Sequence, residues 1–144
     1  MKQADEVRAL FTGNYFGAPC STEELSRAES ELGEQLNPEL RELYLSFNGF
    51  HGPTDAGFFW PLWGDNGFVQ LNKFYREDDL FPRELMLLCM FFGDGGGGSH
   101  WGYKRDLPGK IILWDAEWGA DFEVVGNSPL EVWRNEKVLY DSLE

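Results

Sequence analysis

The sequence predicts an α+β fold in which a mostly antiparallel sheet of about four to six strands is flanked by N-terminal helices and a C-terminal helix. Capped amphipathic segments open the chain, short apolar segments separated by turn residues follow from residue 58, and another capping signature begins the C-terminal part. With 144 residues, 42% of them hydrophobic and 26% charged, the chain has the composition of one folded domain, residues 1–144.

Two helices are expected before residue 34. Apolar residues at helical spacing predict a first helix around residues 7–11, which stops in the turn-forming residues 12–14. Ser21 followed by Glu24 forms a capping box, which predicts that a second helix starts there. Gly33 is suited to end this helix, because glycine adopts the left-handed conformation common after a last helical turn.

A third helix follows a short turn. Asn37 and Pro38 are a helix cap and a first-turn proline, and the pair Asn48-Gly49 breaks the helix that they begin. One side of this helix is apolar along its whole length. That side consists of Leu40, Leu43, Tyr44 and Phe47.

The hydrophobic pattern changes after this helix. Residues 58–63 predict a strand closed by the turn-rich residues 64–67, and residues 68–75 fit either a strand or a short helix. Residues 85–92 form a continuous apolar run, which is typical of a strand covered on both faces. We therefore expect residues 85–92 to be the central strand of the sheet.

The next segments predict a meander of antiparallel strands. Residues 93–99 form a glycine-rich loop, residues 100–103 a strand, residues 107–109 a turn and residues 110–114 another strand. Residues 122–125 add a further strand.

A C-terminal helix is expected after these strands. Ser128, Pro129 and Glu131 form its capping signature, and Leu130 and Trp133 face inward. The residues predicted to be in the core are Leu40, Leu43, Phe47, Leu87, Leu88 and Ile112.

Several of these pieces occur in a characteristic order. They are the helix ending at residues 31–33, the helix of residues 36–44, the pair Asn48-Gly49, the strand of residues 87–92, the glycine turn of residues 93–96, the aromatic strand after it, residues 111–115 and the helix start at residues 128–131. In this order they resemble the SUKH superfamily, which includes a yeast cell-wall assembly regulator and many bacterial immunity proteins. The glycine run of residues 95–98 and the extra Asn37 before Pro38 depart from the family pattern. The resemblance implies a non-enzymatic protein-binding domain that bacteria use to block toxins, many of them nucleases.

The charge of the chain restricts its partners. Asp and Glu number 25 against 12 Lys and Arg, and the net charge of -13 repels nucleic acid and anionic lipid. We therefore expect no nucleic-acid partner and no membrane partner. The same charge is explained equally by a soluble monomer with no further role for it and by steering of a basic partner. With only two cysteines and no signal-peptide pattern in residues 1–10, a cytoplasmic location is expected.

No catalytic, cofactor or metal site is expected. The glycine loop before His100 lacks the lysine of a phosphate-binding loop and precedes a strand where such a loop requires a helix. His51 and His100 lie far apart, and neither has a metal-ligand partner at helical spacing. Cys89 lies inside an apolar run, which favours an inert thiol in the core, and Cys20 precedes a helix cap, which favours a position on the surface without a role.

Aromatic residues make up 16% of the chain, and its six tryptophans are difficult to bury completely in one small domain. Exposed rings beside loop carboxylates would suit a basic partner, because carboxylates accelerate the encounter and desolvated rings slow dissociation. We therefore predict a protein-binding face on residues 93–121, with the surface around residues 58–63 as the next candidate. The prediction is an immunity protein for a basic toxin domain, with two alternatives, a regulatory or scaffolding module for a host protein and a small enzyme with a glycine-loop site. The predicted contact residues are Asp94, Trp101, Asp106, Asp115, Glu117, Trp118 and Asp121.

Overall fold

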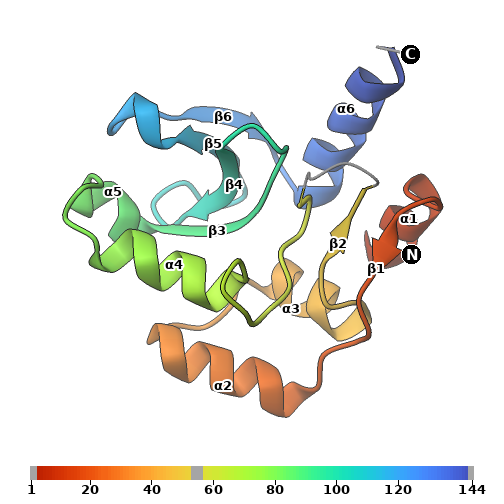
Figure 1. The fold of residues 1–144 in the computed structure, drawn as a ribbon, viewed down its shortest axis with the longest axis horizontal. Coiled ribbons are helices and arrows are strands. Elements are labelled where there is room, and N and C mark those ends of the chain that lie inside the picture. The colour runs from red at the N-terminus through yellow and green to blue at the C-terminus, as the bar shows by residue number, and fades with distance from the viewer. Residues whose placement is uncertain (1–2, 53–56, 143–144) are drawn as a thin grey trace.

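The structure, a computed structural model, describes residues 3–52 and 57–142. Its elements in chain order are α1 (Gln3–Leu10), β1 (Tyr15–Phe16), α2 (Thr22–Leu32), α3 (Pro38–Ser46), β2 (Phe50–His51), α4 (Phe68–Glu77), α5 (Arg83–Leu88), β3 (Cys89–Asp94), β4 (Ser99–Lys104), β5 (Ile111–Asp115), the 3-10 helix η1 (Ala116–Trp118), β6 (Glu123–Gly126) and α6 (Pro129–Ser142). Strands β3 to β6 form a four-stranded antiparallel sheet, and β1 pairs with β2 in a separate ribbon. Helix α4 packs against β3 and against α2, and α6 lies beyond the end of β6 (Figure 1). This confirms the predicted α+β architecture.

Helices α2 and α3 begin at the predicted caps and α2 ends at the predicted Gly33, whereas α1 begins earlier, at Gln3, and α3 ends at Ser46, just before the Asn48-Gly49 pair. The Ser21 hydroxyl accepts a hydrogen bond from the Glu24 amide at 3.1 Å, and the Glu24 carboxylate accepts one from the Ser21 amide at 3.0 Å. Gly33 ends α2 with a φ of 73°, a conformation that favours glycine. The Asn37 side chain accepts from the Glu39 amide at 2.9 Å and so caps α3.

The apolar run of residues 85–92 is not one strand, and that prediction is wrong. Pro82 precedes the short helix α5, and only Cys89 begins the strand β3. The strand also lies at the edge of the sheet instead of its centre. An unbroken apolar run has no periodicity that distinguishes a short buried helix from a strand. As a consequence Leu87 is exposed and Leu88 half-buried, against the prediction that both are in the core.

The other predicted core residues, Leu40, Leu43, Phe47 and Ile112, are fully buried. Neighbouring residues of one strand enter different hydrophobic clusters, because successive side chains of a strand point to opposite faces. Phe92 packs with Phe59 and Trp133, whereas Phe91 belongs to the second cluster. Both faces of the sheet are therefore covered, which explains why β3 reads as continuously apolar.

The segment before α4 differs from the predicted strand. Residues 58–63 form no regular strand, and only Phe59 makes an isolated antiparallel bridge, to Phe50 of β2. The Trp60 amide donates to the Phe92 carbonyl at 2.9 Å, which joins the segment to β3. Residues 68–75, which fitted strand or helix, belong to α4.

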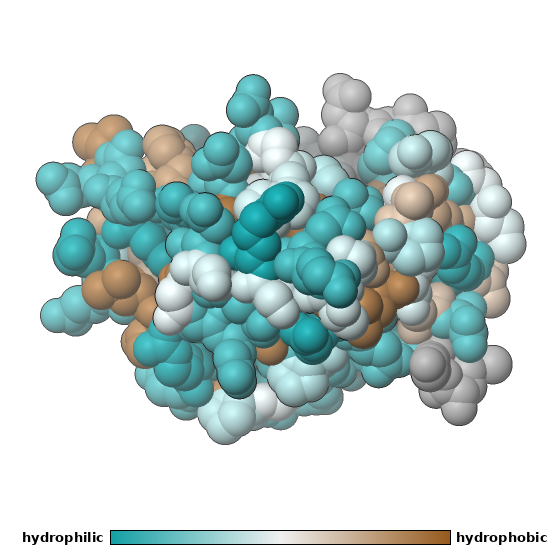
Figure 2. All heavy atoms as spheres, turned by 90° about the horizontal axis from the view of Figure 1, so that it is seen from below, coloured by the Kyte–Doolittle hydropathy of each residue, from teal (hydrophilic) through white to brown (hydrophobic). Residues whose placement is uncertain are grey.

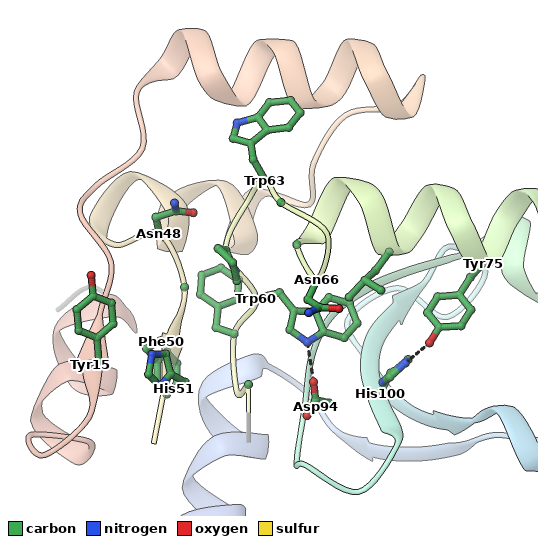
Figure 3. A pocket seen from close by; sticks show the side chains of 17 residues that line it. Tyr15, Asn48, Phe50, His51, Trp60, Trp63, Asn66, Tyr75, Asp94 and His100 are labelled. Carbon is green, nitrogen blue, oxygen red and sulfur yellow. Dashed lines mark hydrogen bonds between the residues drawn. The ribbon is translucent and has the colours of Figure 1, made fainter. Parts of the chain in front are cut away.

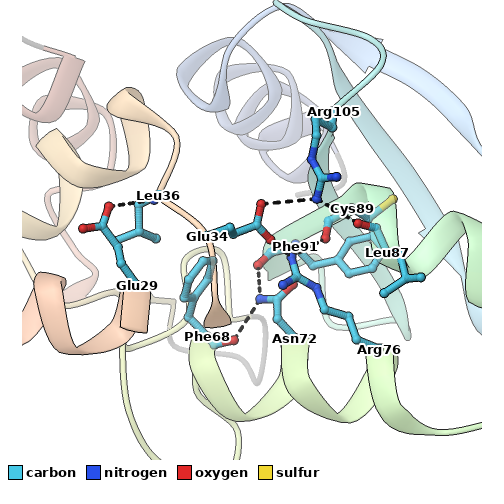
Figure 4. A network of polar contacts seen from close by, with 10 residues as sticks. All are labelled: Glu29, Glu34, Leu36, Phe68, Asn72, Arg76, Leu87, Cys89, Phe91 and Arg105. Atoms are coloured by element: carbon cyan, nitrogen blue, oxygen red, sulfur yellow. Dashed lines mark hydrogen bonds and ion pairs between the residues drawn. The ribbon is translucent and has the colours of Figure 1, made fainter. Parts of the chain in front are cut away.

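The outer edge of β3 is held by side chains of α4 (Figure 4). Asn72, which is 1% exposed, bonds both the amide and the carbonyl of Phe91 at 2.8 Å. Arg76 donates to the Cys89 carbonyl at 2.9 Å and pairs with Glu34 in the loop after α2. Unpaired backbone groups of an edge strand would otherwise be open to pairing with another chain.

The surface on the side of α2 is mostly hydrophilic, and its apolar areas are small and separate (Figure 2). Isolated apolar side chains of this kind are normal on a folded protein. None of the helices in the described ranges is long and apolar enough to cross a membrane.

Candidate partner-binding site

Acidic side chains gather at one end of the four-stranded sheet. In the strand register Asp94 lies opposite His100, and Ser99 lies opposite Asp115. The end of β3, the start of β4 and the end of β5 therefore meet at this edge, and η1 and the connection to β6 follow directly. We call this set the acidic end; it consists of Asp94, Asp115, Glu117, Trp118 and Asp121.

Hydrogen bonds position the acidic end. Asp115 accepts from the Ser99 hydroxyl at 3.1 Å, which ties β4 to β5, and from the Glu117 amide at 2.9 Å, which caps η1. The indole N–H of buried Trp114 donates to the Gly119 carbonyl at 2.8 Å and fixes the turn after η1. Trp118, between Glu117 and this turn, is 36% exposed.

The segments that form this end carry carboxylates but no basic residues of their own. Residues 92–103 and 111–133 contain no Lys or Arg. In the described part of the chain, ion pairs form with other carboxylates, such as Glu29, Glu31 and Glu34. The backbones of Lys104, Arg105 and Lys110 lie at or beside the β4–β5 turn, at the opposite end of the sheet. The Lys104 side chain reaches back along the sheet, and its ammonium lies 5.2 Å from the centre of the Phe122 ring.

Two of the seven predicted contact residues lie elsewhere. Trp101 is 3% exposed and stacks on Phe58 in the core, because its position in β4 points it inward. Asp106 lies in the β4–β5 turn, away from the acidic end, and accepts a hydrogen bond from Lys104 at 2.6 Å. This bond lowers the pKa of Asp106.

A pocket of about 690 Å³ lies next to Asp94 (Figure 3). The loop around β2, residues 57–67, helix α4 and the adjoining ends of β3 and β4 form its walls. It brings Asp94 together with the segment around residues 58–63, which the sequence had indicated as a separate surface. The rings in its lining are Tyr15, Phe50, His51, Phe59, Trp60, Trp63, Tyr75 and His100.

Three hydrogen bonds organise the polar side of the pocket, and Figure 3 shows the two that join lining residues, Trp60 with Asp94 and Tyr75 with His100. The indole N–H of Trp60 donates to Asp94 Oδ2 at 2.7 Å, while the Gly96 amide donates to Asp94 Oδ1 at 2.8 Å. The Tyr75 hydroxyl and His100 Nε2 share a hydrogen bond of 2.5 Å. Burial lowers the pKa of His100, although the nearby Asp94 acts in the opposite direction. The imidazole is therefore neutral at pH 7.

Sequence reasoning had considered His100 and the aromatic segment, but it missed Asn48, Asn66 and Tyr75. No local motif marks these three, because they come from separate loops and a helix that only the fold brings together. In the described part of the chain, no three His, Cys, Asp or Glu side chains are placed so that they could hold a metal ion.

Comparison with known proteins identifies the family. A search of curated proteins gives no significant match. Residues 19–142 match the sequence model of the SMI1 / KNR4 family (SUKH-1), a range that includes the whole acidic end and the pocket residues other than Tyr15. The chain therefore belongs to the SMI1 / KNR4 family (SUKH-1).

Proposed function

We propose that this protein is a non-catalytic immunity protein that acts in the cytoplasm and neutralises a toxin by binding a basic surface of it. Membership of the SUKH-1 family supports a protein-binding role. The observation that carries the proposal is the acidic end, where four carboxylates and an exposed tryptophan gather on segments without Lys or Arg.

The physical argument concerns the toxin as much as the immunity protein. A nuclease must bind phosphates and does so with Lys and Arg, so its active site is basic. Carboxylates at one end of a chain with a net charge of -13 attract such a surface over long range and orient the approach. The ring of Trp118 then supplies apolar contact area, which is typical of side chains that dominate binding energy.

The first experiment identifies the partner. The tagged protein is purified from its native host, and the proteins that accompany it are identified by mass spectrometry. A toxin domain, encoded next to this gene and neutralised in a growth assay by its co-expression, is the expected result. A host protein without toxicity would overturn immunity in favour of a regulatory role.

A matched pair of charge reversals then tests the face. Asp121→Lys and Asp106→Lys change the net charge equally, but only Asp121 lies at the acidic end. At low salt, Asp121→Lys should slow association with the purified toxin domain several-fold, and Asp106→Lys should have a much smaller effect. In the parent protein, association should slow steeply towards physiological salt, where the Debye length is about 8 Å. Equal effects of the two variants, or association independent of salt, would remove the acidic end from the mechanism.

Trp118 makes a separate contribution. Trp118→Ala should mainly accelerate dissociation and cost about 2 kcal/mol of binding free energy if the ring is buried at the centre of the interface. Surface plasmon resonance measures both rate constants, so loss of charge and loss of the ring are distinguishable.

A further inference from the structure

Long-range attraction of a basic partner does not require the pocket beside Asp94. The pocket has a distinctive lining of aromatic rings and a carboxylate. Among the residues that the structure describes, its lining combines eight rings with one carboxylate, that of Asp94, and contains no Lys or Arg. Aromatic faces carry negative potential, and together with a carboxylate they form a site for a cation.

We propose that this pocket receives an arginine side chain displayed on the surface of the protein partner. The inference rests on the proposed function, because it takes the partner to be a basic protein, and it names the contact that follows the electrostatic encounter.

The position of Asp94 suits a guanidinium. Each carboxylate oxygen accepts one hydrogen bond in the structure, from Trp60 at 2.7 Å and from Gly96 at 2.8 Å. A carboxylate offers about four acceptor positions, so two remain for a two-pronged contact. The existing bonds hold the carboxylate in place, which reduces the conformational entropy that binding has to remove.

The rings around Asp94 suit a planar cation. A guanidinium stacks on aromatic faces and bonds a carboxylate with the same group, which an ammonium does less well. The chain makes such a contact with Trp63, whose ring points towards α2 and away from Asp94 (Figure 3): the guanidinium of Arg27 lies 4.5 Å from the centre of this ring. A volume of about 690 Å³ is also ample for one arginine side chain with its flanking backbone.

The electrostatics of the pocket favour the same occupant. His100 is neutral at pH 7 because burial lowers its pKa, and so it does not repel a cation. Asp115 accepts from Ser99 beside His100 and adds a second negative charge near the pocket. An anionic or purely apolar group would meet Asp94 without compensation.

The test uses the isotope-labelled protein and a blocked tripeptide, acetyl-Gly-Arg-Gly-amide. Nuclear magnetic resonance follows the chemical shift of the Trp60 indole N–H, which donates a hydrogen bond to Asp94. We expect a saturable shift with millimolar affinity for the arginine peptide. The matched citrulline peptide, which has the same shape without the charge, should bind about tenfold more weakly or not at all.

Paired variants separate local contact from overall charge. Asp94→Asn should weaken binding of the arginine peptide about tenfold, whereas Asp121→Asn, which removes the same charge outside the pocket lining, should weaken it by less than about threefold. Equal shifts from the two peptides, equal losses in the two variants, or shifts confined to other parts of the protein would each overturn the proposal. The peptide comparison uses the parent protein, so it decides the question even if Asp94→Asn fails to fold.

The peptide experiment can be carried out and interpreted without the toxin. Failure of the peptide to bind would overturn the arginine site and leave a growth-rescue result intact. Binding of the peptide without a toxin partner would instead contradict immunity and leave the arginine site in place.

Discussion

Replacement of Asn72 by alanine tests how the edge of β3 is held. The side chain is 1% exposed, and it bonds the amide and the carbonyl of Phe91 at 2.8 Å each. Its third hydrogen bond goes to the Phe68 carbonyl at 2.8 Å. This carbonyl lies one turn earlier in α4, where it can also accept the helix's own backbone hydrogen bond, so loss of the side-chain bond should cost less. Alanine would leave two buried backbone groups without these partners, and each such group costs about 1–3 kcal/mol. The free energy of unfolding should therefore fall by about 2–6 kcal/mol, a large part of the 5–15 kcal/mol typical of a domain.

Urea unfolding followed by tryptophan fluorescence measures this loss. Gln70→Ala, an exposed change on the same helix, is the control and should lie within about 0.5 kcal/mol of the parent. Asn72→Asp keeps an acceptor for the Phe91 amide but places a carboxylate against the Phe91 carbonyl. That variant should be strongly destabilised at pH 7 and recover partly in acid, where the protonated carboxyl regains a donor. A loss below about 1 kcal/mol for Asn72→Ala would refute the view that this side chain holds the edge.

Three further results are expected. Leu43→Ala removes a fully buried side chain of α3 and should lower the free energy of unfolding in urea by about 2–5 kcal/mol; a loss within experimental error would contradict its role in the core. Burial raises the pKa of Cys20 to about 11 and that of Cys89 to about 12, so both thiols should resist iodoacetamide at pH 8 and react once the chain is unfolded; rapid native labelling would contradict this. Burial lowers the pKa of His100 below its ordinary 6.5. Below about pH 6.5 the unfolded chain therefore binds a proton that the folded chain does not, and the free energy of unfolding decreases as the pH is lowered. The loss between pH 7 and pH 5 should therefore be smaller in His100→Gln, and an unchanged loss would exclude His100 as its source.

The N-terminal helices were predictable because their signals are local. A capping box at Ser21 and Glu24 joins residues three apart, and the Asn37 cap acts within its own turn. Such contacts form in the same way whatever the rest of the fold does. By contrast, the boundary between α5 and β3 depends on which side of Leu85 to Cys89 is covered by other elements. A continuous apolar run does not indicate which of its sides is covered.

The pocket could not be predicted for a related reason. Trp60 and Asp94 are 34 residues apart in the sequence, and Tyr75 and His100 are 25 apart. Each residue alone has an ordinary explanation, as a core ring or a loop carboxylate. Only the packing of residues 57–67 against the end of β3 brings them to one cavity.

The separation of Asp106 from the acidic end, however, follows from the predicted topology itself. In a meander, successive turns lie alternately at opposite ends of the sheet. The β3–β4 loop and the connection after β5 therefore share one end, and the β4–β5 turn with Asp106 lies at the other. Grouping carboxylates by sequence proximity overlooked this alternation. Applied to the predicted strands, it would have assigned Asp94 and Asp115 to one face and Asp106 to another.

The same alternation places Arg105 and Lys110 at or beside one turn and the acidic end at the opposite end of the sheet. If the partner is a basic protein, as proposed, this arrangement would attract it towards Asp94, at the mouth of the pocket. Salt should weaken the long-range attraction more than the contact inside the pocket, because attraction over more than about 8 Å is screened and a contact inside a pocket is screened much less. Association should thus depend strongly on salt and dissociation weakly, and an arginine held by Asp94 would account for the second part.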